Sequence, residues 1–224
     1  MKTLIIMPAY NESKVLADTL DSLLSVLDAT VLIVDDGSTD ETARITGRYG
    51  GSKRVVIVKH IVNLGLGAAI ETGLEYARRN GYDVAVTFDA DGQHNPKDAI
   101  KLISALRDSD LVIGVRHVNR ESMPAVKKAG NALLNVLTGL IFGVYSRDSQ
   151  SGLRAFNRKA LEAIRVKANR YEVSSEILFE AKRNGLRISE VEVEAIYTEH
   201  SKNRGTGVLD GFKILWRMVI HKMG

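Results

Sequence analysis

Short apolar runs alternate with amphipathic stretches through the first half of this chain. The runs at 3–7, 31–34, 55–59, 84–88 and 111–115 are rich in Val, Ile and Leu and have the length of buried strands. Between them apolar residues recur at helical steps, as they do from Val15 to Leu27. This alternation predicts an α/β fold in which helices sandwich a mostly parallel, Rossmann-like sheet with right-handed crossovers.

The pattern changes near Arg116. Residues 122–144 are apolar at helical positions but carry basic side chains, and residues 209–224 repeat this pattern with a tryptophan on the apolar face. Basic amphipathic helices are typical of elements that lie on a membrane surface. Packing on the core of the protein, or on a second copy in a homodimer, would produce the same pattern.

We expect a single domain over residues 1–224. Its first half, 1–115, contains the alternating strands and helices, and 116–208 forms a second half that includes the amphipathic stretch at 122–144. Residues 209–224 form the terminal amphipathic helix. A length of 224 residues with 45% hydrophobic content is enough to bury a full core.

Composition limits which cellular compartment and which kinds of metal site we expect. The chain has no cysteine, so a disulfide framework and a thiolate metal site are both excluded. No apolar run reaches the roughly 18 residues that span a bilayer, and the first residues do not resemble a secretory signal. We therefore expect a cytoplasmic protein that is peripherally associated with the cytoplasmic face of the membrane.

Charge is distributed unevenly around a net value of +4. Residues 1–113 contain 12 basic and 16 acidic side chains, whereas residues 114–224 contain 19 basic and 11 acidic ones. The second half therefore favours an anionic partner such as a phosphorylated substrate or a membrane surface. Neither an aromatic platform nor a recognition helix accompanies the basic residues, so we do not expect nucleic acid to be the partner.

The clearest candidate chemistry lies directly after the run at 84–88. Asp89 and Asp91 stand one residue apart, followed by Gly92, Gln93 and Pro96. Two hard carboxylates at a strand end suit Mg²⁺ or Mn²⁺, although a polar turn has a similar composition.

Polar residues also follow the first two runs. These are the segments Pro8-Ala9-Tyr10-Asn11-Glu12 and Asp35-Asp36-Gly37-Ser38-Thr39-Asp40. Parallel strands deliver their carboxyl ends to one edge of a sheet, so we expect all three segments to line one cleft. This convergence favours a ligand site over turn chemistry alone.

These motifs, with the segments 63–69, Asp89 to Pro96 and 151–156, resemble family 2 glycosyltransferases of the GT-A fold. The similarity is to the group that includes dolichyl-phosphate mannose synthase and related polyprenyl-phosphate sugar transferases, and it covers nearly the whole chain. It implies an inverting hexosyltransferase that moves a sugar from GDP-mannose or a UDP-hexose to a polyprenyl or dolichyl phosphate.

The resemblance also implies roles for individual residues. The nucleotide sugar would be held by Pro8, Tyr10, Glu12, Asp36, Asp89 and Ala90. The divalent ion would be held by Asp89, Asp91 and Gln93. Catalysis would involve Asp91, Arg116 and Arg204, and the acceptor would meet Ser151, Arg154, His200 and Lys202. Since a phosphate monoester is already largely ionised at neutral pH, we name no catalytic base; Asp148 is a helper at most.

Other functions fit less well. An aspartate-nucleophile phosphatase places its acid pair after the first strand, where this chain has Pro8-Ala9-Tyr10, and Gly65-Leu66-Gly67 lacks the third glycine of a dinucleotide fingerprint. A transferase acting on a soluble saccharide remains open, as does a non-catalytic protein that binds nucleotide sugars at a membrane. The sequence leaves the nucleotide, the sugar, the acceptor length and the oligomeric state undetermined.

Overall fold

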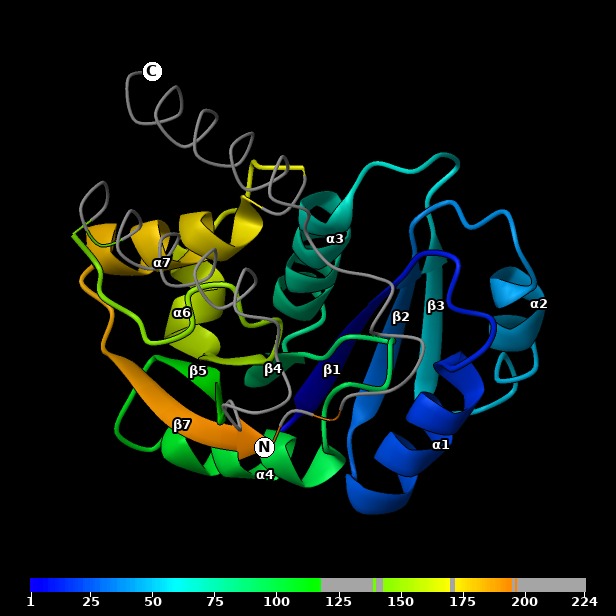
Figure 1. The fold of residues 1–224 in the computed structure, drawn as a ribbon, viewed down its shortest axis with the longest axis horizontal. Coiled ribbons are helices and arrows are strands. Elements are labelled where there is room, and N and C mark those ends of the chain that lie inside the picture. The colour runs from blue at the N-terminus through cyan, green and yellow to red at the C-terminus, as the bar shows by residue number, and fades with distance from the viewer. Residues whose placement is uncertain (118–138, 140–142, 170–171, 195, 197–224) are drawn as a thin grey trace.

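The computed structural model describes residues 1–117, 139, 143–169, 172–194 and 196. The described strands form one seven-stranded sheet in the order β3-β2-β1-β4-β6-β5-β7 (Figure 1). The strands are β1 (Thr3–Ala9), β2 (Thr30–Asp35), β3 (Val55–Lys59), β4 (Val84–Thr87), β5 (Leu111–His117), β6 (Arg154–Asn157) and β7 (Ile188–Glu194). The helices are α1 (Leu16–Val26), α2 (Thr42–Gly47), α3 (Leu66–Arg79), α4 (Pro96–Ala105), α6 (Arg158–Ala163) and α7 (Val173–Arg183).

The sheet is mostly parallel, as predicted. β1 pairs in parallel with β2 and β4, β2 with β3, and β5 with β7. β6 is the exception, because it runs antiparallel between β4 and β5. The segment 151–156, which carries part of the family resemblance, thus leads into a strand whose direction no sequence pattern predicted.

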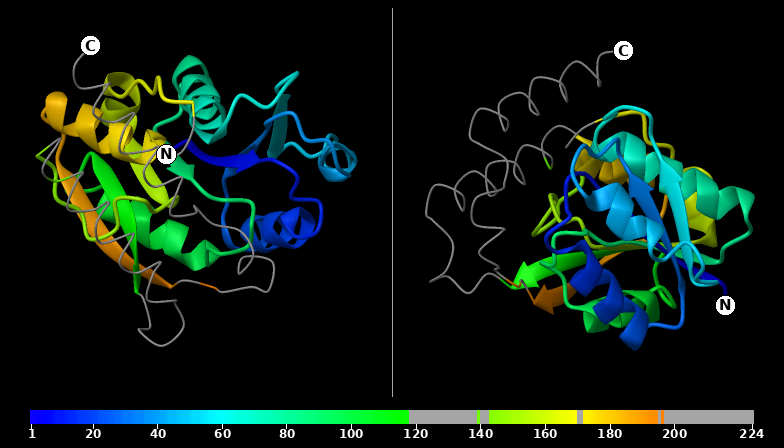
Figure 2. Two further views of the ribbon diagram at one scale, coloured as in Figure 1. Left: turned by 45° about the horizontal axis from the view of Figure 1, so that its top comes forward. Right: turned by 90° about the vertical axis from the view of Figure 1, so that its right-hand side faces the viewer.

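Helices cover both faces of the sheet (Figure 2), and an apolar cluster packs on each face. Alternate residues of β1 point to opposite faces, so Ile5 and Met7 belong to one cluster and Leu4 and Ile6 to the other. Helices α1 and α4 bury their apolar residues in the first cluster, and α3, α6 and α7 bury theirs in the second. The periodicity that predicted the helices is therefore the periodicity of their contact with the sheet.

Local signals also set where helices begin. Asn95 accepts a hydrogen bond from the backbone N of Lys97 at 3.0 Å, and Pro96 occupies the first turn of α4. Asn157 caps α6 in the same way, through the backbone N of Ala160 at 2.9 Å. The chain therefore turns sharply into α4 directly after the acidic motif.

Parts of the predicted second half lie outside the described residues. This applies to nearly all of the helix expected at 122–144, to the helix expected at 209–224, and to His200, Lys202 and Arg204. Within the described part of the chain, none of the helices has the length and hydropathy required to cross a bilayer.

Candidate active site

The acidic motifs lie at the point where the strand order of the sheet reverses. The chain winds from β1 to β2 and β3 on one side and then returns to place β4 on the other side of β1. In open α/β sheets, ligands bind at such switch points, outside the carboxyl ends of the strands. The parallel pairing of β1 with β2 and β4 puts the segments that follow these three strands at one edge of the sheet, as predicted, and the cleft that they were expected to line stays a prediction.

The segments after β1 and β2 are joined by a hydrogen-bonded network. Asn11 has a positive φ of 56°, and its side-chain Oδ1 accepts a hydrogen bond from the backbone N of Thr39 at 2.9 Å. The backbone N of Asn11 donates to Ser38 Oγ at 3.0 Å, and that of Glu12 to Thr42 Oγ1 at 2.9 Å. These contacts place Tyr10, which is exposed, on a fixed surface beside the end of β2.

Asp36 organises the neighbouring segment between β3 and α3. Its carboxylate is buried and accepts hydrogen bonds from the backbone N of Leu64 at 2.9 Å and of Gly65 at 2.8 Å. The Nδ1 of His60 lies 2.7 Å from the same carboxylate. The predicted contact of Asp36 with a nucleotide thus stays a prediction, whereas its structural contacts are direct.

Asp89 is held in place by His94. The Nε2 of His94 lies 3.0 Å from Asp89 Oδ2, and the buried imidazole packs edge-on against Phe88 with the ring centroids 5.4 Å apart. Burial alone would raise the pKa of Asp89, but the hydrogen bond to His94 and the charges of His94, Arg154 and Arg116 outweigh it and lower the pKa. Asp89 is therefore ionised and oriented at neutral pH.

Asp91 has the opposite electrostatic environment. Burial raises its pKa, and the nearby charge of Asp89 raises it further, against hydrogen bonds from Gln93. The backbone N of Gln93 donates to Asp91 Oδ1 at 3.0 Å and its side-chain Nε2 to Oδ2 at 2.5 Å. Gln93 thus braces Asp91, and a metal contact by Gln93 would use the other atom of its amide.

The donor set fits a hard divalent cation that is only partly coordinated by protein. Among the described residues, no group of three or more His, Asp or Glu side chains is placed to hold a metal ion by itself. Asp89 and Asp91 instead supply two carboxylates that repel each other, and a cation between them would relieve this repulsion. Mg²⁺ commonly binds through one or two carboxylates and takes its other ligands from substrate phosphates and water.

The segment before β6 packs directly on Asp89, which the sequence did not predict. A Cβ atom built on Gly152 would lie 2.0 Å from Asp89 Oδ2. Thr87 Oγ1 donates to the carbonyl O of Gly152 at 2.7 Å, which fixes this approach. The pairing of β6 with β4 therefore brings residue 152 to the acidic motif, and the glycine leaves room for the carboxylate.

Two basic residues of the predicted site, Arg116 and Arg154, lie close enough for their charges to act on Asp89. Arg116 forms a bidentate ion pair with Asp148, at 2.7 Å from Nε to Oδ2 and 2.9 Å from the terminal nitrogen to Oδ1. Arg154 is almost completely buried; it donates to the carbonyl O of Ser149 at 3.0 Å, and burial lowers its pKa to about 10. Its charge is offset by Asp89 and Asp148.

Other predicted site residues differ in exposure. Ser151 is fully buried, like Arg154, so neither side chain presents a surface to an acceptor in this structure. Pro8 and Glu12 are half-buried, and Ala90 is buried. Their predicted roles stay predictions.

The segment that contains the predicted residues Arg204, His200 and Lys202 begins beside the acidic motif. The backbone N of Ile196 donates to the carbonyl O of Gln93 at 3.0 Å. The end of β7 is also attached to α4, because the backbone N of Glu194 donates to Asp98 Oδ2 at 2.9 Å. Only the starting point of the basic segment is therefore placed near the site.

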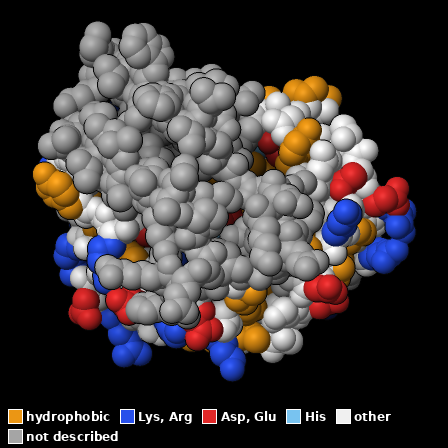
Figure 3. Space-filling model, in the orientation of Figure 1, with side chains coloured by type: hydrophobic (Ala, Val, Ile, Leu, Met, Phe, Trp, Pro, Cys, Tyr) orange, Lys and Arg blue, Asp and Glu red, His pale blue; other side chains and the backbone are white. Residues whose placement is uncertain are grey.

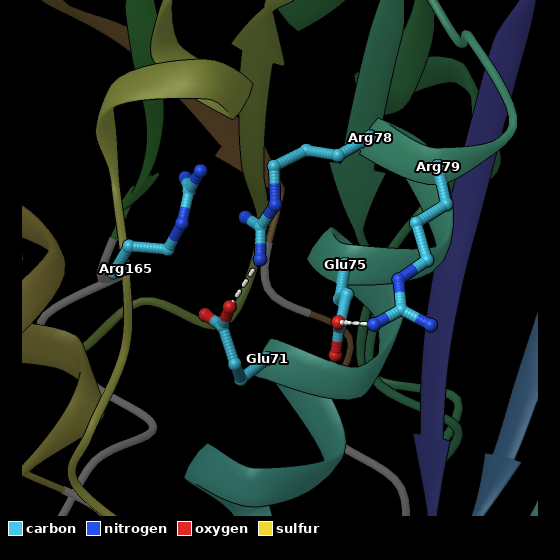
Figure 4. A pocket seen from close by; sticks show the side chains of 5 residues that line it. All are labelled: Glu71, Glu75, Arg78, Arg79 and Arg165. Atoms are coloured by element: carbon cyan, nitrogen blue, oxygen red, sulfur yellow. Dashed lines mark hydrogen bonds and ion pairs between the residues drawn. The ribbon is translucent and has the colours of Figure 1, made fainter.

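A separate hollow of about 460 Å³ lies against α3 and does not contribute to this site (Figure 4). Within it Arg78 points to Glu71 and Arg79 to Glu75, and both pairs are ion pairs. The guanidinium of Arg165 donates to backbone carbonyls at the end of α6. The last turn of α3, which lines part of this hollow, lies near the start of β1, since Lys2 Nζ donates to the carbonyl O of Asn80.

Relatives of the chain include proteins named for lipid-linked sugar transfer. It is 43% identical over 240 residues to a UDP-N-acetylglucosamine–dolichyl-phosphate N-acetylglucosaminyltransferase of Methanococcus voltae, covering 98% of this chain and 96% of the relative. It is 32% identical over 219 residues to an undecaprenyl-phosphate mannosyltransferase of Micrococcus luteus, covering 94% and 90%.

Solved structures share the fold. Glucosyl-3-phosphoglycerate synthase from Mycobacterium tuberculosis in complex with UDP superimposes with a TM-score of 0.75 at 21% identity, covering 99% of this chain and 80% of that one. The same enzyme with Mn²⁺, UDP-glucose and phosphoglyceric acid gives a TM-score of 0.70 at 22% identity, covering 99% and 78%. At these identities the similarity establishes the GT-A architecture alone.

The family model described as "Glycosyl transferase family 2" matches residues 4–165, a range that runs from β1 through α6 and contains all the described acidic motifs. With the switch-point geometry and the relatives above, this match shows that the chain is a glycosyltransferase and belongs to glycosyl transferase family 2.

Proposed function

We propose that this protein is a metal-dependent inverting glycosyltransferase that moves a sugar from a nucleotide sugar to a polyprenyl or dolichyl phosphate. The observation that carries the proposal is the pair Asp89 and Asp91 at the switch point, where His94 and Gln93 orient the two carboxylates. A nucleotide diphosphate that lies across this edge would meet both carboxylates through a shared divalent ion.

The relatives support the lipid acceptor and suggest a donor. The names of the Methanococcus voltae and Micrococcus luteus proteins specify dolichyl phosphate and undecaprenyl phosphate. The structural neighbours bind UDP and Mn²⁺, which supports a divalent ion at the acidic pair. We infer that UDP-N-acetylglucosamine is the first donor to test, since it is named for a relative that is 43% identical over almost the full length of both chains.

The proposed reaction breaks the bond between the sugar C1 and the nucleoside diphosphate and forms a bond from C1 to an oxygen of the acceptor phosphate. A bound Mg²⁺ or Mn²⁺ supplies stabilisation of the negative charge on the leaving diphosphate. Asp89, kept ionised and oriented by His94, and Asp91, braced by Gln93, would hold that ion. The acceptor phosphate needs little help from a base, because its second pKa is about 6.

On the acceptor side we propose that the charges of Arg116 and Arg204 offset the charge of the lipid phosphate. The ion pair with Asp148 fixes the guanidinium of Arg116 at the end of β5, and the segment with Arg204, His200 and Lys202 starts beside Gln93. The protein would reach its acceptor from a peripheral position on the membrane surface.

A panel of radiolabelled sugar nucleotides tests the proposal. Each donor is incubated with the protein, Mg²⁺ or Mn²⁺ and either a polyprenyl phosphate or a water-soluble saccharide, and label is counted in the lipid and aqueous phases. We expect transfer from UDP-N-acetylglucosamine into the lipid phase, abolished by a chelator. Faster transfer to the soluble saccharide would refute the lipid acceptor.

Two matched variants test the metal site. Asp91→Asn should lower metal-dependent turnover by at least about 100-fold while the protein stays folded, because it removes one of two ligand charges. Asp108→Asn removes an exposed carboxylate from the turn after α4 and should leave turnover unchanged. Full activity of Asp91→Asn, or wild-type activity in the presence of a chelator, would contradict the proposed metal site.

A further inference from the structure

The segment between β3 and α3 exposes apolar side chains at the same edge of the sheet as the acidic site. Ile61 is 98% exposed, Val62 59% and Leu64 48%. We call residues 61–64 the apolar tip. Figure 3 shows hydrophobic side chains gathered at the upper right margin, where Figure 1 places the turn from β3 into α3. Since β3 runs parallel to β2, the apolar tip extends from the carboxyl edge.

The backbone of the apolar tip is fixed, so the exposure of its side chains is part of the fold. Asp36 accepts hydrogen bonds from the backbone N of Leu64 and of Gly65. Gly37, with a φ of +71°, lies so close that a Cβ there would be 2.5 Å from the carbonyl carbon of Val62. The backbone of the apolar tip is thus in close contact with the segment that follows β2, whereas its apolar side chains are exposed to solvent.

Contiguous exposed apolar side chains in a fixed segment mark a contact surface. A stable protein dimer buries about 800 Å² per partner over about 20 residues or more, which a tip of four residues does not supply. A lipid surface needs no complementary shape, and a few apolar side chains can enter its headgroup region.

The charge around the apolar tip fits an anionic lipid surface. Lys59, at the base of the tip, is exposed. Residues 59–70, which run from this lysine through the tip into α3, contain no Asp or Glu, so no acidic residue of this segment opposes anionic headgroups. Anionic lipids such as phosphatidylserine or phosphatidylglycerol are therefore the partner that fits this charge.

We propose that the apolar tip inserts into the headgroup region of an anionic bilayer and holds the carboxyl edge of the sheet against the membrane. The proposal rests on the proposed function, in which the acceptor phosphate belongs to a membrane lipid. It adds a contact formed by the nucleotide-binding half of the chain, separate from the two amphipathic stretches predicted at 122–144 and 209–224.

Site-specific labelling tests this contact directly, because the chain contains no cysteine. Ile61→Cys and, as the matched control, Ile100→Cys would each be labelled with an environment-sensitive fluorophore. Ile100 is also an exposed isoleucine, 42% accessible, but lies on α4 away from the tip. With vesicles containing phosphatidylglycerol, label at residue 61 should shift to the blue and gain intensity, and label at residue 100 should not.

A loss-of-contact variant gives the second measurement. Ile61→Ser combined with Val62→Ser should weaken sedimentation with these vesicles by at least about tenfold, because two apolar side chains no longer leave water. Ile100→Ser should bind vesicles as the wild type does. Transfer to a short-chain acceptor phosphate dissolved in buffer should be the same for all three proteins.

Several outcomes would overturn the inference, and they differ from failure of the proposed function. No response at residue 61, equal responses at 61 and 100, or unchanged vesicle binding by the double variant would each reject insertion of the tip. A weaker affinity of the double variant for the nucleotide sugar in buffer would identify the tip as part of the donor site instead. The proposed function fails separately, if label never enters a polyprenyl phosphate.

Discussion

Replacing Gly152 by alanine should disable the site without unfolding the protein. The added Cβ would lie 2.0 Å from Asp89 Oδ2, whereas ordinary van der Waals contact begins near 3.4 Å, so the carboxylate must move by about 1.4 Å. Gly152 does not have a positive φ, so its backbone accepts alanine without strain. A displacement of about 1 Å at a reacting group can cost about 100-fold in rate, or about 2.7 kcal/mol of transition-state stabilisation.

The assay is transfer of labelled sugar at increasing Mn²⁺, together with thermal denaturation. We expect Gly152→Ala to lower kcat/KM by about 100-fold and to change the midpoint of unfolding little, since the end of a side chain can rotate away at small cost. Gly51→Ala is the control, because a Cβ there meets no atom within 4 Å. If Gly152→Ala retained activity within a few-fold of the wild type, the position of Asp89 would not limit the reaction and the reasoning would fail.

Three further predictions concern other parts of the site. Burial would raise the pKa of Asp40, but hydrogen bonds from Ser13 and Thr42 outweigh it and lower the pKa from 3.8 to about 2. The ionised carboxylate therefore stabilises the fold above about pH 4 and loses this contribution as the pH falls toward 2. Denaturant titrations of Asp40→Asn should show a loss of about 1–2 kcal/mol at pH 7 that shrinks below pH 4. Asp36→Ala should release the apolar tip, and hydrogen exchange should be faster at the amides of Leu64 and Gly65; unchanged protection would contradict the assigned contacts. Arg204→Ala should impair use of the acceptor more than binding of the nucleotide, and equal losses in steady-state kinetics and calorimetry would place it at the donor instead.

Local periodicity was sufficient to predict most of the secondary structure. The strand at 55–59 and the helix between Val15 and Leu27 agree with the structure, because buried strands and amphipathic helices leave short-range signals. The sequence likewise predicted that the segments after β1, β2 and β4 would share one edge, since parallel strands allow no other arrangement.

Long-range pairing was beyond those signals. The antiparallel insertion of β6 between β4 and β5 depends on which strands meet, and a short apolar run has the same pattern in either direction. That pairing buries Arg154, which the resemblance assigned to the acceptor, and brings Gly152 against Asp89. His94 is part of the acidic motif, but only its contact with Asp89 Oδ2, made while its ring packs on Phe88, shows that it orients Asp89.

The sequence by itself determined the fold class, the family resemblance and the acidic pair, because each depends on residue types at short spacings. The tertiary structure decided how the pair is supported: it placed His94 and Gly152 on Asp89, and it turned Asp36 toward the β3–α3 segment. The physical reason is that orientation, burial and charge compensation arise from contacts between strands distant in the chain, which no local pattern records.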